Sequence, residues 1–443
     1  MRIRFRGPLK KLFDQEHLSP RTRQSLYFLT VGGIMGSLCC TVCGSGTSAL
    51  TSLASFLGAG DFVYGVLTAI PMLAALLQIP FSIIVSRAPR RHPFMLTYSL
   101  IGRALWIVIG LVPFFLQGAE NWIQLWTIIL LVGLSSALQS FINVCWMPWM
   151  ADVAPIHMRG RWMSIKDSIS NVATALFGLV VGWLLDAMPN MVGYGIIFGI
   201  SGIFGVIDML TYIGVEDVRS APPSQIKVTS VLKKLLGDKR FLWFMIFWTG
   251  WCFTANMSGM YYTRYSVNEM GLTYTQITIF ATIVACVTTT VFMPFWGRQM
   301  DRYGYKPVMW VSALVGSLTP LIYLFSSPAN VWPTFIYNFL GAMFWCASNL
   351  ACTNMQLGYA PDVERASYVA IFSCVTSIAG GFLGVLSGGA LLEMLDGMGF
   401  GADRYLIMFA LSSILRLVVV LLLLPKMENN REYTVRDMLA RKL

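Results

Sequence analysis

"FWGRQMDRYGYKP", residues 295–307, is a short charged stretch between two long apolar runs. Gly297 and Gly304 flank Asp301 and Arg302, and Lys306 follows just before the next apolar run. Glycine tolerates the backbone conformations of a tight reversal, so the stretch predicts a short loop between two helices. Each neighbouring run is long enough to cross the ~30 Å hydrocarbon core of a bilayer as a helix.

The composition of the whole chain indicates a helical membrane protein. Of the 443 residues, 56% are hydrophobic and 12% are charged, whereas soluble domains carry about 25% charged residues. About twelve apolar stretches have the length of a membrane-spanning helix. Because unpaired backbone groups are costly in lipid, such stretches cross the bilayer as helices. The sequence therefore predicts an all-α integral membrane protein with about twelve transmembrane helices.

The charges are distributed unevenly between the two sides of the predicted spans. Most of the 32 Lys and Arg residues lie in the termini and in loops on the same side as the termini. The opposite loops hold the acidic residues Asp61, Glu120, Asp186, Glu269, Glu393, Asp396 and Asp403. Because positively charged loops stay in the cytoplasm, we expect both termini to be cytoplasmic in a plasma membrane. The net charge of +11 is therefore a topology signal, and we expect no nucleic-acid partner.

The chain contains an internal repeat around one long polar connection. Equivalent Gly, Asn, Pro and Arg residues recur in order: Gly46, Gly58, Asn143, Pro155 and Arg159 correspond to Gly259, Gly271, Asn349, Pro361 and Arg365. Parallel six-helix repeats are typical of two-lobed transporters. The predicted segments are a cytoplasmic N-terminal segment (1–24), a six-helix bundle (25–215), a cytoplasmic linker (216–240), a second, pseudo-symmetric six-helix bundle (241–425) and a cytoplasmic tail (426–443).

The opening stretch resembles a known loop signature. Its Gly, Asp, Arg, Gly and Lys residues are similar to the G-x-x-x-D-R-x-G-x-K/R pattern of the major facilitator superfamily, and "DVAPIHMRGR", with Asp152 and Arg159, resembles the element between spans 4 and 5 of that family. The first-half loop after span 2 lacks the equivalent Asp, and span 5 lacks the Gly-Pro element of drug–proton antiporters. The resemblance implies alternating access, with a cytoplasmic gate formed by Gly297, Asp301, Arg302, Gly304, Lys306, Arg365, Asp152 and Arg159. We expect Asp301 to pair with Arg365, the alternative being a solvated turn.

The resemblance also places the substrate cavity mainly between spans 1, 4, 7 and 10. Spans 1 and 7 are interrupted by polar and glycine residues at matching positions, "CGSGTS" and "TANMSGMYYTRY", as expected where helices loosen around a ligand. The substrate-binding candidates are Gln78, Gln139, Asn143, Trp146, Asn171, Trp251, Asn256, Tyr261, Asn338, Trp345 and Asn349. For each of them the alternative is an interhelical hydrogen bond or an interfacial aromatic.

Five ionisable residues lie within the predicted spans, where burial is costly unless they are paired or face water. We expect Arg103 to pair with Asp208 as a structural contact, and Arg416 to pair or to reach the membrane surface. Lys166 and Asp167 lie about two turns into span 5, and Asp167 is the candidate for coupling transport to protons. The nine cysteines lie in apolar spans, where small buried hydrophobes are commoner than metal ligands, so we expect no metal or cofactor.

The sequence favours one function over three others. Amides and aromatic residues in the predicted cavity suit uptake of a small polar, sugar-like or ring-bearing solute, with a proton as the candidate symported ion and a monomer as the working unit. Export of amphipathic or lipid-like compounds is the alternative, since 25 Met and 28 Phe could line an adaptable apolar cavity. A membrane sensor would need a soluble extension. An enzyme would need a convergent catalytic group, which the sequence does not offer.

Overall fold

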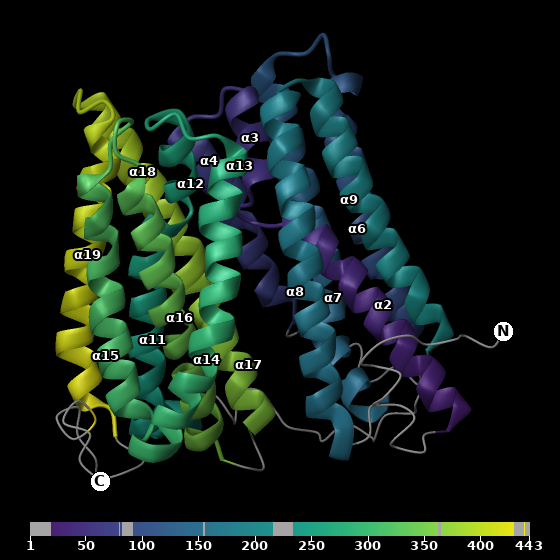
Figure 1. Cartoon of the computed structure of the whole chain (residues 1–443), viewed down its shortest axis with the longest axis vertical. Coiled ribbons are helices and arrows are strands. Elements are labelled where there is room, and N and C mark those ends of the chain that lie inside the picture. Colours follow the sequence, from purple (N-terminus) through teal and green to yellow (C-terminus); the bar gives the residue numbers. More distant parts are fainter. Residues whose placement is uncertain are drawn as a thin grey trace. The chain divides into compact units, whose positions relative to one another are not determined.

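A computed structural model of the chain describes residues 19–78, 80–81, 92–153, 156–215, 234–361, 365–428 and 438. These residues are almost entirely helical (Figure 1), and the one β-bridge among them joins Ser327 to Asn330. The chain divides into two compact units. Unit 1 comprises Met1–Gly58 and Ala74–Ser224, and unit 2 comprises Ala59–Leu73 and Gln225–Leu443.

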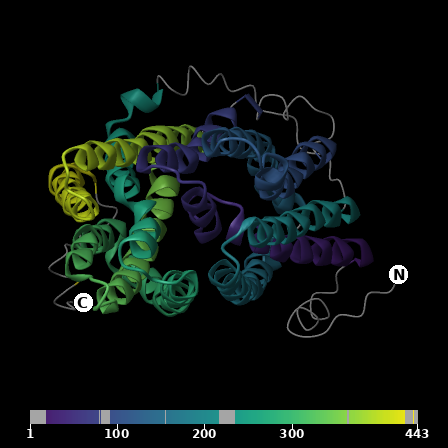
Figure 2. The same ribbon diagram turned by 90° about the horizontal axis from the view of Figure 1, so that it is seen from above.

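Unit 1 holds most helices of the first half of the chain. They are α2 (Pro20–Val42), α3 (Ser48–Phe56), η1 (Ala74–Leu77), α6 (His92–Phe115), α7 (Asn121–Val153), α8 (Ile156–Ala187), α9 (Met191–Thr211) and η2 (Tyr212–Gly214). In unit 1, α9 packs against both α2 and α6 (Figures 1 and 2). Leu26, Leu29, Trp162 and Met209 are buried in its core.

Unit 2 combines the second half of the chain with one helix from the first half. Its elements are α4 (Asp61–Leu73), α11 (Lys239–Gly259), α12 (Tyr261–Asn268), α13 (Tyr274–Ile277), η3 (Thr278–Ile283), α14 (Val284–Tyr303), α15 (Tyr305–Leu318), η4 (Thr319–Phe325), α16 (Trp332–Tyr359), α17 (Arg365–Val375), η5 (Thr376–Phe382), α18 (Leu383–Gly397), α19 (Asp403–Leu423) and η6 (Leu424–Lys426). Phe241, Phe244, Trp251 and Phe372 are buried in its core.

Helix α4 is attached to unit 2 by a buried charge cluster at its first residue. The Asp61 carboxylate accepts hydrogen bonds from Arg264 Nε (2.7 Å) and Tyr405 Oη (2.6 Å) on one oxygen and from Arg404 Nε (3.1 Å) on the other. Further along, Tyr64 Oη donates to the Met260 carbonyl at 2.9 Å. Charge pairing and packing against α18 thus place a first-half helix in the second unit.

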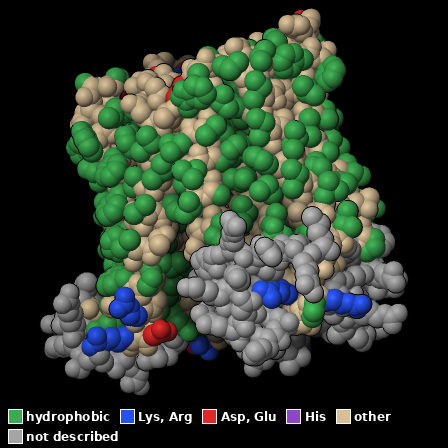
Figure 3. Space-filling model, turned by 45° about the vertical axis from the view of Figure 1, so that its right-hand side comes forward, with side chains coloured by type: hydrophobic (Ala, Val, Ile, Leu, Met, Phe, Trp, Pro, Cys, Tyr) green, Lys and Arg blue, Asp and Glu red, His purple; other side chains and the backbone are tan. Residues whose placement is uncertain are grey.

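Ten helices among the described residues are long and apolar enough to cross a membrane. Two of the predicted spans fall outside this set. Of the second, the described part is a shorter apolar helix, Asp61–Leu77, and the seventh, α11, contains several polar side chains. Apolar side chains cover the helix surfaces in Figure 3. On α8 an exposed stripe consists of Val172, Leu176, Val180 and Trp183, as expected for a face turned to lipid.

Backbone geometry supports the internal repeat. Gly58 and Gly271, which the sequence comparison aligned, both have a positive φ, of 73° and 70°, a conformation that glycine adopts without strain.

Three glycines allow close helix packing in unit 2. A Cβ atom on Gly380, Gly384 or Gly388 would lie only 2.0–2.8 Å from atoms of α11. The absence of side chains there lets α11 approach η5 and α18 closely.

Candidate functional site

Both interruptions predicted from the sequence are present. Helix α2 ends at Val42 and α3 begins at Ser48, with Gly46 between them at φ 69°. Thr47 Oγ1 donates to the Val42 carbonyl at 2.8 Å, so its side chain replaces a missing helical donor. In the second half, α11 ends at Gly259 and α12 begins at Tyr261. Each break interrupts a predicted span.

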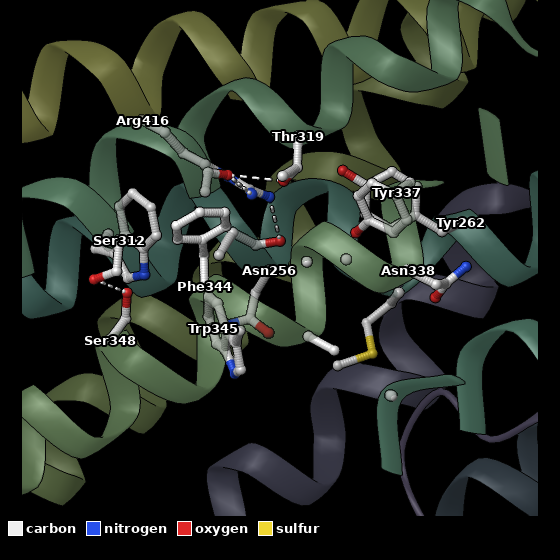
Figure 4. A pocket seen from close by; sticks show the side chains of 18 residues that line it. Asn256, Tyr262, Ser312, Thr319, Tyr337, Asn338, Phe344, Trp345, Ser348 and Arg416 are labelled. Carbon is white, nitrogen blue, oxygen red and sulfur yellow. Dashed lines mark hydrogen bonds between the residues drawn. The ribbon is translucent and has the colours of Figure 1, made fainter. Parts of the chain in front are cut away.

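A cavity of about 330 Å³ lies next to the second interruption, inside unit 2 (Figure 4). Its lining comes from five regions: α11 with the start of α12, α14, α15 with η4, α16, and α19. We call this the unit 2 cavity. Its lining residues are Trp251, Ala255, Asn256, Gly259, Met260, Tyr262, Ala285, Ser312, Gly316, Thr319, Tyr337, Asn338, Gly341, Ala342, Phe344, Trp345, Ser348 and Arg416.

One wall of the cavity contains a carbonyl that a proline has freed. Pro320 has no N–H, so it cannot donate to the Gly316 carbonyl four residues earlier. Thr319 Oγ1 donates to that carbonyl at 2.9 Å, and Arg416 Nη1 donates to it at 3.3 Å. The chain changes here from the α15 helix to the 3₁₀ segment η4. Thus local sequence, Gly316-x-x-x-Pro320, creates an acceptor that recruits a charged side chain from α19.

Arg416 is 5% exposed and differs from both sequence-based expectations, since it is buried and no carboxylate among the described residues pairs with it. Its Nη2 donates to the Ala255 carbonyl (3.3 Å) and to Ser258 Oγ (3.0 Å). The guanidinium carbon lies 6.0 Å from the centre of a Trp251 ring. The Nε atom is buried without a hydrogen-bond partner among the described residues.

A chain of hydroxyl groups fixes the donor direction beside Arg416. Ser412 Oγ donates to the Thr254 carbonyl at 2.7 Å, so its proton is used there. Ser258 Oγ therefore donates to Ser412 Oγ (3.0 Å), and Tyr262 Oη donates to Ser258 Oγ (3.0 Å), because each hydroxyl has a single proton. Ser258 is left to accept from Arg416. The network joins α11, α12 and α19 across the helix break.

Aromatic rings form much of the remaining wall. Trp251 and Trp345 are stacked with their ring centres 6.3 Å apart, and Tyr262 and Tyr337 lie 4.6 Å apart. The amide nitrogens of two lining asparagines donate to backbone carbonyls, Asn256 to Cys252 (2.8 Å) and Asn338 to Thr334 (2.8 Å). Their side chains remain part of the cavity wall (Figure 4). The lining therefore combines flat apolar surfaces with a few polar groups, as ligand sites do.

The structure brings four of the substrate-binding candidates together in this cavity: Trp251, Asn256, Asn338 and Trp345. Tyr261 is instead buried against Tyr64, and its hydroxyl donates to the Val385 carbonyl at 3.1 Å.

The remaining substrate-binding candidates do not line this cavity. Gln78, Gln139 and Trp146 are half-buried in unit 1, and Asn171 and Asn349 are exposed. The side chain of Asn143 lies outside the described residues. The roles of all these residues stay predictions.

Four charged residues within the predicted spans of unit 1 form two pairs. Arg103 Nη2 lies 3.2 Å from Asp208 Oδ2, which confirms the predicted pair, and Arg103 Nη1 donates to Cys39 Sγ at 3.4 Å. The cysteine cluster thus contacts an arginine, and no group of metal-ligating side chains occurs among the residues that the structure describes. Lys166 Nζ lies 2.7 Å from Asp167 Oδ1, and the Asp167 side chain is 56% exposed. Its coupling role stays a prediction.

The loop that opened the sequence analysis is a one-residue reversal. Gly304 separates α14 from α15 with φ 92°, a conformation that favours glycine. Lys306 Nζ donates to the carbonyls of Pro425 (3.2 Å) and Met427, so it neutralises the carbonyl end of the last helix. Asp301 and Arg302 are exposed, and Gly297 lies within α14. The side chains of Arg365, Asp152 and Arg159 lie outside the described residues, so the predicted gate pair stays a prediction.

A contact between the end of α16 and the segment after α19 lies beside this loop region. Burial raises the pKa of Tyr359 to about 12, so its hydroxyl stays protonated at neutral pH. It donates to the Glu428 carbonyl at 2.6 Å, and the Arg240 guanidinium lies over its ring at 4.5 Å. These contacts fix the segment after α19 against the end of α16.

Sequence reasoning missed the part of the cavity that the ninth and twelfth predicted spans supply, which are α15 with η4 and α19 in the structure. Ser312, Thr319 and Arg416 come from these spans, which the family resemblance had left out of the predicted cavity. The available signal was Arg416 itself, because it lies in the span with the highest mean hydropathy of the ten, 2.7. A cation in the middle of such a segment points to a functional site.

Comparison with protein families decides the identity of the chain. The model of the family "Major Facilitator Superfamily" matches residues 32–291 and 265–437. The chain belongs to this superfamily. It is therefore a secondary membrane transporter and not an enzyme, and the predicted family and helical fold are confirmed. No curated protein sequence matches this transporter significantly.

Solved structures show the same fold at low sequence identity. A mutant of the nucleoside transporter NupG has a TM-score of 0.72 and 13% identity over 91% of this chain and 100% of its own. An inward-facing bacterial homologue of the human lysosomal transporter Spinster has a TM-score of 0.67 and 13% identity, covering 94% and 100%. A D-xylose–proton symporter has a TM-score of 0.64 and 15% identity, covering 89% and 96%. At such identities the likeness concerns the fold alone.

Proposed function

We propose that this transporter moves a small polar solute, sugar-like or ring-bearing, across the plasma membrane by alternating access, with uptake as the favoured direction. The observation that carries the proposal is the unit 2 cavity beside the α11–α12 interruption. Its volume of about 330 Å³ is at the small end of ligand sites, which suits a solute of one or two rings. The stacked Trp251 and Trp345 rings offer flat surfaces on which a ring can pack.

The charge pattern of the loops supports a proposal on orientation. We infer that both termini are cytoplasmic, because the basic residues gather in the termini and in the loops on their side. On this basis the Gly304 reversal, with Asp301 and Lys306, lies at the cytoplasmic end of unit 2. Asp301 and Arg365 then remain the proposed gate pair. We also propose that the protein works as a monomer.

Export of an amphipathic compound is the second candidate. Met260 and Phe344 in the cavity wall favour it, because flexible thioether and aromatic side chains accommodate varied apolar groups. The two directions are distinguished by measuring solute movement in right-side-out and inverted membrane vesicles. A membrane sensor would bind a solute without moving it in either preparation.

The test is a thermal-stability screen of the purified protein against a library of sugars, nucleosides and other small ring compounds, followed by uptake into proteoliposomes with each compound that stabilises it. Trp345→Ala removes one ring of the stacked pair, and we expect it to weaken binding of such a compound about 10-fold. Trp332→Ala, on the same helix but 68% exposed, is the matched control and should bind as the wild type does. Equal affinity of the Trp345 variant and the wild type would exclude the unit 2 cavity as the binding site.

A further inference from the structure

We propose that the solute of the unit 2 cavity is an organic anion and that Arg416 binds its carboxylate or phosphate group. The inference rests on the proposed function, because it assigns a charge to the substrate of the same site. It concerns the charge of the ligand, which membership of the superfamily does not specify. Arg416 comes from α19, an otherwise strongly apolar helix of unit 2.

The cavity has an uncompensated positive charge. Arg416 is the only charged side chain among its described lining residues. Its hydrogen-bond partners, the Gly316 and Ala255 carbonyls and Ser258 Oγ, are all uncharged. Burying a charge without an opposite charge is unfavourable. An anion in the cavity would remove this cost, whereas a neutral solute would leave it in place.

The guanidinium also has donors to spare. It carries five N–H groups, and its three hydrogen bonds to protein occupy three of them. Nε is buried and has no partner among the described residues, and the same holds for Trp251 Nε1 in the cavity wall. In the hydroxyl chain, Ser258 Oγ already accepts hydrogen bonds from Tyr262 and from Arg416, so both of its acceptor lone pairs are occupied.

A purely structural role does not account for this arrangement. A cross-link between α11, α15 and α19 through backbone carbonyls needs donors, which a neutral amide or hydroxyl supplies, but it does not need a full charge. Arginine is the side chain that matches the geometry of a carboxylate or phosphate. In Figure 4 Arg416 extends from its helix toward the other lining side chains, with the aromatic rings of Phe344 and Trp345 on one side. A ring that carries an acidic group fits this combination.

The probes are benzoate and phenyl phosphate, with benzamide and benzyl alcohol as neutral counterparts of similar shape. Melting temperatures of the purified full-length protein are measured with each probe, and dissociation constants by titration calorimetry. We expect the anions to stabilise the wild type and the neutral compounds to do so much less. Arg416→Gln, which keeps amide donors, should weaken benzoate binding about 10- to 100-fold. Arg416→Lys, which keeps the charge, should lose less.

Arg240→Gln is the control for removal of a charge, since Arg240 lies on the surface of unit 2, and it should bind benzoate as the wild type does. Equal benzoate affinity of wild type and a folded Arg416→Gln protein would overturn the proposal. Failure of every anionic probe to stabilise the wild type would overturn it as well. If only phosphatidylglycerol displaced the bound anions, the site would bind lipid, and the proposal would also fall. If neutral compounds bind in a Trp345-dependent manner and anions do not, the proposed function stands and this inference falls. If anion binding depends on Arg416 but no bound compound is taken up, this inference stands and the proposed function falls.

Discussion

At the scale of single residues, the buried carboxylate of Asp61 accepts three hydrogen bonds in unit 2, from Arg264, Arg404 and Tyr405. It is 6% exposed and balances Arg264, which is itself buried, together with Arg404. Removing one member of a buried ion cluster is costly because the remaining charges lose their partner. The cluster therefore fixes α4, a helix of the first half of the chain, to the second unit.

Asp61→Asn is expected to destabilise the protein by about 3–5 kcal/mol, since Arg264 would stay buried without a full counter-charge. Thermal or denaturant unfolding of the purified protein in detergent measures the effect. Asp396→Asn is the matched control: Asp396 also binds Arg404, but its side chain is 60% exposed, so its loss should cost no more than about 1 kcal/mol. Similar losses of unfolding free energy for both variants would mean that Asp61 is no better shielded from water than Asp396.

At the scale of the elements, the glycines of η5 and α18 set the distance to α11. A Cβ on Gly388 would lie 2.0 Å from the Met257 carbonyl oxygen and 2.9 Å from the ring of Tyr261. Because that carbonyl belongs to the backbone of α11, the two helices would have to separate. A Cβ on Gly380 or Gly384 would lie 2.8 or 2.6 Å from the nearest atom of α11, so the close contact continues along both helices.

Gly388→Ala should therefore destabilise the protein by about 1–3 kcal/mol or more, the cost of overpacking a tight contact. Gly199→Ala in α9 is the control, because a Cβ there meets nothing within 4 Å, and alanine in a helix should be neutral or stabilise by up to about 1 kcal/mol. Unfolding midpoints of the two purified variants check both expectations. A Gly388 variant as stable as the wild type would show that the helices can move apart at little cost.

At the scale of the whole molecule, coupling to an ion distinguishes a symporter from a facilitator. Asp167 is the proposed coupling group: it is a carboxylate within a membrane-spanning helix, and it pairs with the adjacent Lys166. Carboxylates at such positions mark ion and proton pathways in transporters.

Asp167→Asn should abolish accumulation driven by a pH gradient in proteoliposomes, while exchange of labelled for unlabelled solute continues. The asparagine keeps the shape of the side chain but cannot bind or release the proton. Asp186→Asn, on the same helix α8 and also exposed, should accumulate solute normally. Undiminished gradient-driven accumulation in the Asp167 variant would rule out this carboxylate as the coupling group.

The sequence by itself determined the helical membrane class, the family, the two helix interruptions, the Gly304 reversal and the pairing of Arg103 with Asp208. These follow from signals that are local or repeated along the chain: the length of apolar runs, glycines at fixed spacing, and rare charges that must find partners in lipid. The aligned glycines Gly58 and Gly271 show the same backbone conformation, and glycine is the residue that adopts a positive φ without strain.

Only the tertiary structure decided which helices share a unit and which side chains share a cavity. Sequence order places α4 in the first half, but the Asp61 cluster joins it to α12 and α19. Likewise Arg416 reaches Gly316, a hundred residues away, because Pro320 leaves that carbonyl without a helical donor. The physical reason is the same in both cases. A buried charge is stabilised by whichever groups surround it in three dimensions, and its spacing along the chain does not reveal them.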